Sequence, residues 1–205
     1  MLDTLTDLAD SMNAALARLG FPSHPVDAYR YFVGDGMETE ARRALPKDKI
    51  NAETIKKCLT IAREEYACRW VRNTRPYPGI AELLTALEER KIRKAILSNK
   101  PDDFTQIIVT RLLSCWTFDL VRGLKPPINP KPDPAAALQI ATEFCVPPHK
   151  ILYLGDTNTD MQTANNAGMF AVGALWGFRT SEELKNSGAK TLVETPLKVL
   201  NLLDE

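Results

Sequence analysis

The segment Ile151 to Met169, ILYLGDTNTDMQTANNAGM, decides how the rest of the sequence is interpreted. Its apolar start, Ile151 to Leu154, is typical of a buried strand, and Gly155 ends that strand. Asp156 then falls just past the carboxyl end of the strand, where open parallel sheets bind their ligands. Asp160 follows one helical turn later, so both carboxylates can reach one point.

The spacing of these carboxylates supports two interpretations about equally. Two carboxylates at the mouth of a sheet suit a hard divalent cation such as Mg2+. Alternatively, Asp156 and Asp160 only cap the helix that follows, because Asp is a favoured residue at helix N-termini. The spacing alone does not choose between a metal site and a helix cap.

The composition of the 205-residue chain is that of a globular protein of one or two domains. Its formal net charge is zero and it has no dense basic patch, which argues against nucleic acid as a partner. The acidic start MLDTLTDLAD differs from a signal peptide, and no apolar run is long enough for a membrane span. The four cysteines form no Cys-x-x-Cys pair. We therefore expect a cytoplasmic protein that binds neither nucleic acid nor membranes.

The amino-terminal part of the chain differs in pattern from the rest. Its segments with a clear apolar period are helical, above all residues 4–19 and 51–70. Residues 71–79, VRNTRPYPG, carry two prolines and a glycine and are typical of a linker. We predict a helical module over residues 1–75 and an α/β domain over residues 76–205.

In the second part of the chain, short apolar segments alternate with helical ones. The expected strands are residues 93–97, 120–122, 151–154, 171–174 and 191–193. Strands that are separated by helices predict a parallel, doubly wound sheet with helices on both faces. The predicted fold class is α/β, with a Rossmann-like sheet preceded by an all-helical module.

Polar residues also follow two other strands of this predicted sheet. Ser98 and Asn99 come after residues 95–97, where their side chains and free backbone N–H groups could hold a phosphate. They could equally well do no more than form the turn. Lys131 lies in the proline-rich loop GLKPPINPKPDP, residues 123–134, and an isolated lysine in a loop is more often solvated than functional.

Taken in order, these motifs resemble those of the haloacid dehalogenase superfamily of phosphotransferases. The resemblance rests on Ser98 in AILSN, Lys131 in KPDP, and Asp156 and Asp160 in G-D-x-x-x-D, with A-x-x-A-G following at residues 164–168. Several motifs in the right order are more specific than any one of them. Within the superfamily, the chain resembles most the phosphoglycolate phosphatase branch, because LWGFR near its end is typical of that branch.

The resemblance implies a phosphatase of small phosphoesters that works through an aspartyl-phosphate. It implies that Lys131 is a catalytic cation that also binds phosphate, and that Ser98 and the N–H of Asn99 bind phosphoryl oxygens. The implied partner is a small phosphorylated metabolite, with 2-phosphoglycolate as the first candidate.

The resemblance also implies Mg2+ as the cofactor. Asp156 would then be a metal ligand, and Asp160 a second ligand or a residue that supports the first. Mg2+ and a lysine together offset the charge that would otherwise make a carboxylate and a phosphate repel each other.

The first motif of the superfamily, D-x-D-G-T-L, is incomplete in this chain. In the family its first Asp attacks phosphorus and its second Asp acts as general acid and base. The chain reads Met1-Leu2-Asp3-Thr4-Leu5, so no residue stands for the attacking Asp. Asp3 is the one candidate for a catalytic carboxylate, and N-capping of the first helix is its simpler interpretation. The apolar strand before the motif, normally central in the sheet, also has no counterpart.

Three explanations of this gap stay open: a truncated or mis-started chain, a sheet that closes in another way, or a non-catalytic relative. The gap matters for folding because unpaired backbone groups of neighbouring strands are costly when buried. The leading interpretation is a phosphatase with impaired catalysis. The alternative is a protein that binds a phosphorylated ligand or a partner on the same scaffold. A receiver-like phosphoacceptor domain is a third option, but it leaves the helical module unexplained.

Overall fold

The computed structural model describes residues 1–203, so the last two residues of the predicted α/β domain lie outside the described part. The chain divides into two compact units, Met1–Pro76 and Tyr77–Glu205, called unit 1 and unit 2 below. Among residues 1–203, no helix combines the length and the apolar character that crossing a membrane requires. The assignment of residues 1–75 as a cap and of residues 76–205 as a core domain stays a prediction.

Unit 1 consists mainly of helices. The two long ones are α1, Leu5–Arg18, and α4, Ala52–Arg69, which pack against each other. Met12 and Cys58 meet in the buried interface between them, with 3.6 Å between their sulfur atoms. The shorter elements between the two helices are η1 (Val26–Ala28), α2 (Tyr29–Phe32), α3 (Met37–Ala44) and η2 (Lys47–Lys49).

The first residues of the chain form a short strand. β1, Leu2–Asp3, pairs antiparallel with β2, Arg75–Pro76. Thr4 holds the N-cap position of α1, while Asp3 Oδ1 accepts a hydrogen bond of 3.3 Å from the N–H of Leu5. The prediction of Asp3 as the N-cap residue was therefore wrong by one position, because strand pairing fixes the backbone of Asp3 and the helix starts after Thr4. The predicted linker likewise contains a strand.

A buried carboxylate joins the two ends of unit 1. Asp7 is 1% exposed and accepts hydrogen bonds of 2.8 to 3.0 Å from the backbone N–H groups and side chains of Asn73 and Thr74. Burial alone would raise the pKa of Asp7, but these hydrogen bonds outweigh burial and hold the pKa below its usual range. Asp7 thereby fixes the start of α1 to the segment that leads into β2.

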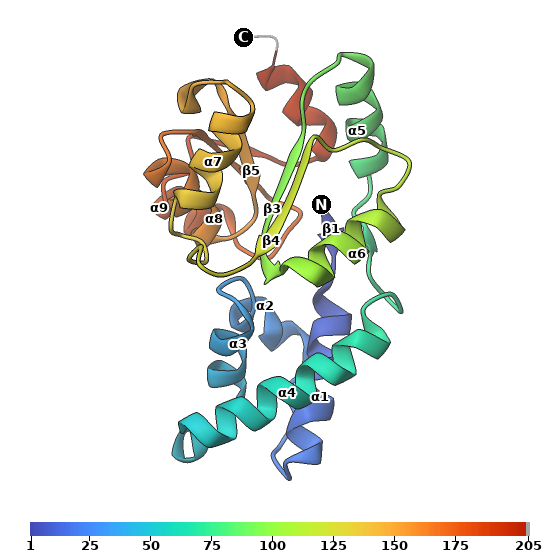
Figure 1. Ribbon diagram of the computed structural model, residues 1–205, viewed down its shortest axis with the longest axis vertical. Helices are drawn as coiled ribbons and strands as arrows, with labels where there is room; N and C mark the ends of the chain where they lie inside the picture. Colours follow the sequence, from blue (N-terminus) through green and yellow to red (C-terminus); the bar gives the residue numbers. More distant parts are fainter. Residues whose placement is uncertain (204–205) are drawn as a thin grey trace. The chain divides into compact units, whose positions relative to one another are not determined.

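Unit 2 contains two parallel sheets with helices around them (Figure 1). In the first sheet, β3 (Ala95–Pro101) pairs with β4 (Leu120–Leu124). In the second sheet, β5 (Leu152–Gly155), β6 (Phe170–Ala174) and β7 (Thr191–Val193) lie in that order. Each strand predicted from the sequence is present; the strand at residues 191–193 matches at both ends, and the others have one or both ends shifted by one to four residues. The α/β class with parallel strands is confirmed.

Helical segments precede, connect and follow the strands of unit 2, and parallel pairing requires such connections. They are α5 (Ile80–Glu89), α6 (Asp102–Leu112), α7 (Ala135–Glu143), η3 (Pro148–Lys150), α8 (Asn158–Asn166), α9 (Ser181–Asn186) and η4 (Pro196–Leu202). At the start of α7, Pro134 holds the N-cap position, and Asp133 Oδ1 accepts a hydrogen bond of 2.8 Å from the N–H of Ala135. That helix therefore begins at Ala135, directly after the proline-rich loop.

Neighbouring residues of β6 show that the second sheet is covered on both faces. Ala171 belongs to a buried cluster with Met161 of α8. Val172 belongs to a different buried cluster with Leu83 of α5 and Val199 of η4. Since successive residues of a strand point to opposite faces, the two clusters lie on opposite sides of the sheet. This is the doubly wound arrangement that the sequence predicts.

Within the described residues, no strand joins the two sheets of unit 2 by backbone hydrogen bonds. β3 pairs with β4 alone, and β5 pairs with β6 alone. This arrangement is the one expected if the first central strand of the superfamily has no counterpart. Leu97 of β3 nevertheless packs against the apolar cluster that contains Met161 of α8. Side-chain contacts therefore connect the two sheets where a backbone ladder would otherwise do so.

Candidate active site

Four predicted site residues of unit 2 lie at the carboxyl ends of strands. Asn99 is near the end of β3 and Lys131 is in the loop after β4, while Asp156 directly follows β5 and Asp160 lies in the first turn of α8. Parallel strands bring their carboxyl ends to the same edge of a sheet. Residues that are far apart in the sequence therefore meet here, and hydrogen bonds link them.

Lys131 and Asp160 form an enclosed ion pair. Lys131 Nζ lies 2.6 Å from Asp160 Oδ1, and the two side chains are only 12% and 9% exposed. The ammonium group also donates to the backbone carbonyl of Leu97 in β3, at 3.4 Å. Lys131 is thus not the solvated loop lysine that its isolated place in the sequence suggests.

The ion pair keeps both of its members charged. Burial alone would raise the pKa of Asp160 and lower the pKa of Lys131. In each residue the opposite charge of the partner outweighs burial, so the pKa of Asp160 lies below its usual value and that of Lys131 lies above its usual value. A charged ammonium is thereby kept at the strand ends, where a phosphate group could use it.

Asp160 also belongs to a capping box at the start of α8. Thr157 holds the N-cap position and accepts from the N–H of Asp160 at 3.2 Å. In return, Asp160 Oδ2 accepts from the N–H and the hydroxyl of Thr157, at 3.1 and 2.7 Å, and from the N–H of Asp156 at 3.2 Å. The helix-cap interpretation therefore holds for Asp160, whereas Thr157, and not Asp156, is the N-cap. These bonds favour Asp160 as the residue that supports a metal ligand.

Asp156 is held by the segment that follows β6. The N–H of Phe178 donates to Asp156 Oδ2 at 3.0 Å. Burial raises the pKa of Asp156, and the negative charge of Asp160 adds to this rise. The motif LWGFR, quoted above only as a resemblance, contains this donor. Sequence reasoning missed the role of Phe178, because a backbone N–H leaves no signal in residue type.

Two glycines allow the backbone to approach these carboxylates closely. A Cβ added at Gly155 would lie 2.2 Å from the Cβ of Asp160, and one added at Gly177 would lie 2.1 Å from Asp156 Oδ2. Both distances are far below any normal contact, so a side chain at either position would force the carboxylate or the backbone to move. The space around each carboxylate therefore depends on the absence of a side chain.

Tyr153 is a site residue that sequence reasoning missed. Its side chain lies on β5 and interacts with the charges of Lys131 and Asp160. Its hydroxyl is buried beside these two charged groups. Burial raises the pKa of Tyr153 to about 12, so the phenol is neutral near pH 7. Strand alternation places Tyr153 on the same face as Gly155, which was the available signal.

The remaining candidates make local contacts. Ser98 Oγ accepts from the N–H of Lys100 at 3.1 Å, and the amide side chain of Asn99 binds the backbone of Lys131. Asp3 belongs to β1 of unit 1. The phosphate-binding roles of Ser98 and Asn99 and a catalytic role of Asp3 stay predictions.

Comparison with known proteins identifies the family. Residues 1–174 match the family described as haloacid dehalogenase-like hydrolase. The chain belongs to the haloacid dehalogenase-like hydrolase family. Phosphoglycolate phosphatase from Nitrosospira multiformis is 26% identical, and that from Nitrosococcus oceani is 28% identical; each match covers 100% of this chain and 92% of the relative. The resemblance to this family and to its phosphoglycolate phosphatase branch is confirmed.

Solved structures of haloacid dehalogenase-like hydrolases share this fold. A crystal structure from Lactobacillus delbrueckii subsp. bulgaricus, provisionally assigned as a phosphoglycolate phosphatase, is 27% identical with a TM-score of 0.91. The match covers 98% of this chain and 93% of that chain. A haloacid dehalogenase-like hydrolase from Streptococcus pneumoniae, 22% identical, has a TM-score of 0.87 over 98% of this chain and 92% of its own. The α/β fold is therefore that of the family.

The donor set of this hydrolase fits the cation that the resemblance implies. Mg2+ is usually bound through one or two carboxylates, with water and substrate phosphates completing its coordination. Asp156 and Asp160 supply such a set, and Gly155 and Gly177 let the backbone approach the two carboxylates closely. Among residues 1–203, no group of three or more His, Cys, Asp or Glu side chains could form an all-protein metal cage.

Proposed function

We propose that the protein is a Mg2+-dependent phosphatase of small phosphoesters, with 2-phosphoglycolate as the first candidate substrate. The main support is the enclosed ion pair of Lys131 with Asp160, which lies next to Asp156 at the strand ends. This pair gathers a buried cation and two carboxylates in one place, as the binding of phosphate together with a divalent cation requires. The names of the similar phosphoglycolate phosphatases supply the candidate substrate.

Each residue has a physical role in this proposal. The ammonium of Lys131 attracts the phosphate group, and the hydroxyl of Ser98 and the N–H of Asn99 donate to its oxygens. Asp156 holds Mg2+, and Asp160 supports it or acts as a second ligand. The bound cation would offset the negative charge of the phosphate, so that an anionic nucleophile could approach it.

We further propose that turnover by this chain is weak. Members of the family use an aspartate that attacks phosphorus and forms an aspartyl-phosphate. Asp3 is the single acidic residue within Met1-Leu2-Asp3-Thr4-Leu5, where the full motif has two. The alternative function is a non-catalytic protein that binds a phosphorylated ligand, for which Lys131 and Asp156 would serve equally well. We propose the cytoplasm as its location, which suits the four cysteines, all of them free thiols.

The test compares turnover with binding in the same preparation. Release of phosphate from 2-phosphoglycolate is measured with and without Mg2+, and binding of inorganic phosphate is measured by calorimetry. Weak turnover that requires Mg2+ and that Asp156→Asn abolishes would support the phosphatase, with Glu82→Gln, an exposed position of α5, as the control. Phosphate binding without any turnover would favour the binding protein. A folded protein that shows neither would overturn the proposal.

A further inference from the structure

Two asparagines bind the backbone of the loop that carries Lys131. Asn99 Nδ2 donates to the carbonyl of Lys131 at 3.1 Å, and Asn99 Oδ1 accepts from the N–H of Lys131 at 2.8 Å. Asn166, the last residue of α8, donates a single hydrogen bond of 3.1 Å to the carbonyl of Pro132. The amide of Asn99 thus pairs with both backbone groups of Lys131, as a neighbouring strand would.

Asn99 is itself held firmly, which makes it an effective anchor. It is 9% exposed and lies in β3 between Leu97 and Pro101, two residues that both pair with β4, at the point where the register of the two strands shifts. Residues 125–134, by contrast, form turns without helix or strand. A loop of this kind is ordered by contacts with more rigid elements, because ordering each residue costs conformational entropy. The two hydrogen bonds to Asn99 provide such a contact at Lys131 itself.

β3 contacts both ends of Lys131. The carbonyl of Leu97 accepts from the ammonium group, while Asn99, two residues further along the strand, binds the backbone. A lysine side chain is long and flexible, so its ammonium can be placed reproducibly only if its backbone is also fixed. The pairing with Asn99 therefore bears directly on where the ammonium lies.

We propose that Asn99 is a positioning residue whose side-chain amide fixes the backbone of Lys131 and so places its ammonium at the phosphate site. This role belongs to the side chain and acts through Lys131. It is distinct from the phosphate contact of the Asn99 backbone N–H considered above. The inference deepens the proposed function and rests on that function for the identity of the ligand.

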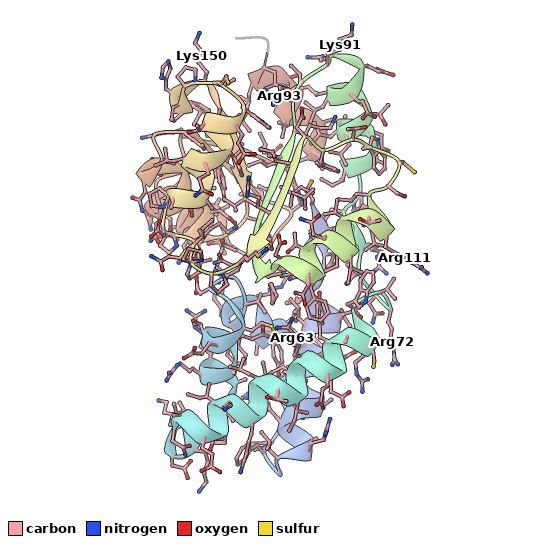
Figure 2. All side chains as sticks on the ribbon, viewed as in Figure 1. Arg63, Arg72, Lys91, Arg93, Arg111 and Lys150 are labelled. Atoms are coloured by element: carbon pink, nitrogen blue, oxygen red, sulfur yellow. The ribbon has the colours of Figure 1, made fainter. Side chains whose placement is uncertain are left out.

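The first test measures the position of Lys131 without any ligand, by acetic anhydride labelling and mass spectrometry. Lys131 should react slowly because its side chain is 12% exposed, and Lys150, at the surface in Figure 2, is the internal reference. Asn99→Ala should raise the labelling rate of Lys131 about tenfold relative to Lys150, because two hydrogen bonds are lost. Asn166→Ala, which removes one bond at the next residue, is the matched control and should raise this rate much less.

A more conservative variant keeps the test informative if Asn99→Ala does not fold. Asn99→Asp has nearly the same shape and keeps the acceptor for the N–H of Lys131, but it loses the donor for the carbonyl. Its labelling rate at Lys131 should lie between those of the wild type and Asn99→Ala. Unchanged labelling of Lys131 in both folded Asn99 variants would overturn the proposal.

The second test uses inorganic phosphate in a double-mutant cycle, measured by calorimetry. Asn99→Ala should weaken phosphate binding about tenfold in the wild-type background and have no further effect in the Lys131→Met background, since coupled residues are not additive. Additive losses would show that the side chain of Asn99 acts independently of Lys131 and would contradict the proposal. If the wild type binds no phosphate, the proposed function fails, but the labelling rates still decide the role of Asn99.

Discussion

The ammonium of Lys131 lies 2.6 Å from the carboxylate of Asp160, and both side chains are almost fully enclosed. Removing one member of a buried ion pair leaves the other charge without compensation, which typically destabilises a protein by about 3–5 kcal/mol. Lys131→Met should therefore lower the free energy of unfolding by about 3 kcal/mol and also weaken the binding of inorganic phosphate. Urea unfolding and calorimetry measure the two effects. Lys150→Met, at an exposed position, should change neither, and equal stability of wild type and Lys131→Met would contradict a buried pair.

Asp7 should make unit 1 sensitive to acid. Its folded pKa lies below the usual value of about 4, so its stabilising contribution is present above that pH and is lost as the pH falls through the folded pKa. Asp7→Asn should lower the free energy of unfolding by about 2 kcal/mol at pH 7, because it removes charged hydrogen bonds to Asn73 and Thr74. Toward acid pH the variant and the wild type should converge.

Urea unfolding over a series of pH values measures this convergence. Asp10→Asn is the matched control, because Asp10 is an exposed carboxylate on the same helix. A difference between Asp7→Asn and the wild type that stayed constant down to the most acidic pH would argue against a lowered pKa for Asp7.

Gly177→Ala should disturb the carboxylate of Asp156. The new Cβ would lie 2.1 Å from Asp156 Oδ2, so either the carboxylate or the segment around Phe178 must move. Displacing a group that orients a metal ligand commonly reduces metal affinity by about tenfold or more, and we expect such a loss for Mg2+ in a calorimetric titration.

Gly168→Ala is the control for Gly177→Ala. Gly168 has a φ of +69°, and a Cβ there would meet nothing within 4 Å. This control should lose about 1 kcal/mol of stability through backbone strain and keep its Mg2+ affinity. Equal Mg2+ affinities for wild type and a folded Gly177→Ala protein would count against Asp156 as the ligand.

Cys145 should be a site where glycine increases stability. Its φ of 49° is in the left-handed region, directly after the C-cap of α7, where helices usually place glycine. Cys145→Gly should raise the free energy of unfolding by about 1 kcal/mol by relieving this strain. Cys145→Ala keeps the strain and should give no gain, and urea unfolding distinguishes the two variants. A Cys145→Gly protein less stable than the wild type would mean that the thiol makes a larger contribution than the strain.

The order of polar strand ends was sufficient to predict that Lys131, Asp156 and Asp160 lie together, while their roles stay predictions. Lys131, Asp156 and Asp160 each follow a strand of a parallel sheet, so the topology alone brings them to one edge. The pairing of Asn99 with Lys131 could not be predicted in this way, because the two residues are separated by a loop whose path depends on tertiary contacts. Its hydrogen bonds involve the backbone of Lys131, and a backbone group leaves no trace in the residue type.

The same distinction applies to the fold: features set by neighbouring residues were predicted, and features set by residues far apart in the sequence were not. The period of the apolar residues was enough to locate the helices and strands, because this period depends only on residues that are close in the sequence. The pairing of Leu2–Asp3 with Arg75–Pro76 was not predicted, because two-residue strands carry no periodic signal. The close approach of Gly177 to Asp156 could not be predicted from the sequence either, although Gly177 is part of the family motif LWGFR.

The separation of β3 and β4 from the other three strands has a consequence for cooperativity. The described residues of unit 2 form two separate parallel hydrogen-bond ladders. Lys131 contacts both parts, through Leu97 of β3 on one side and Asp160 of α8 on the other. Amides of the two ladders can then exchange with solvent through separate opening events of different free energy. A phosphate bound at Lys131 would couple the two opening events. Phosphate binding would then change the amide exchange rates even in strands that the phosphate does not contact.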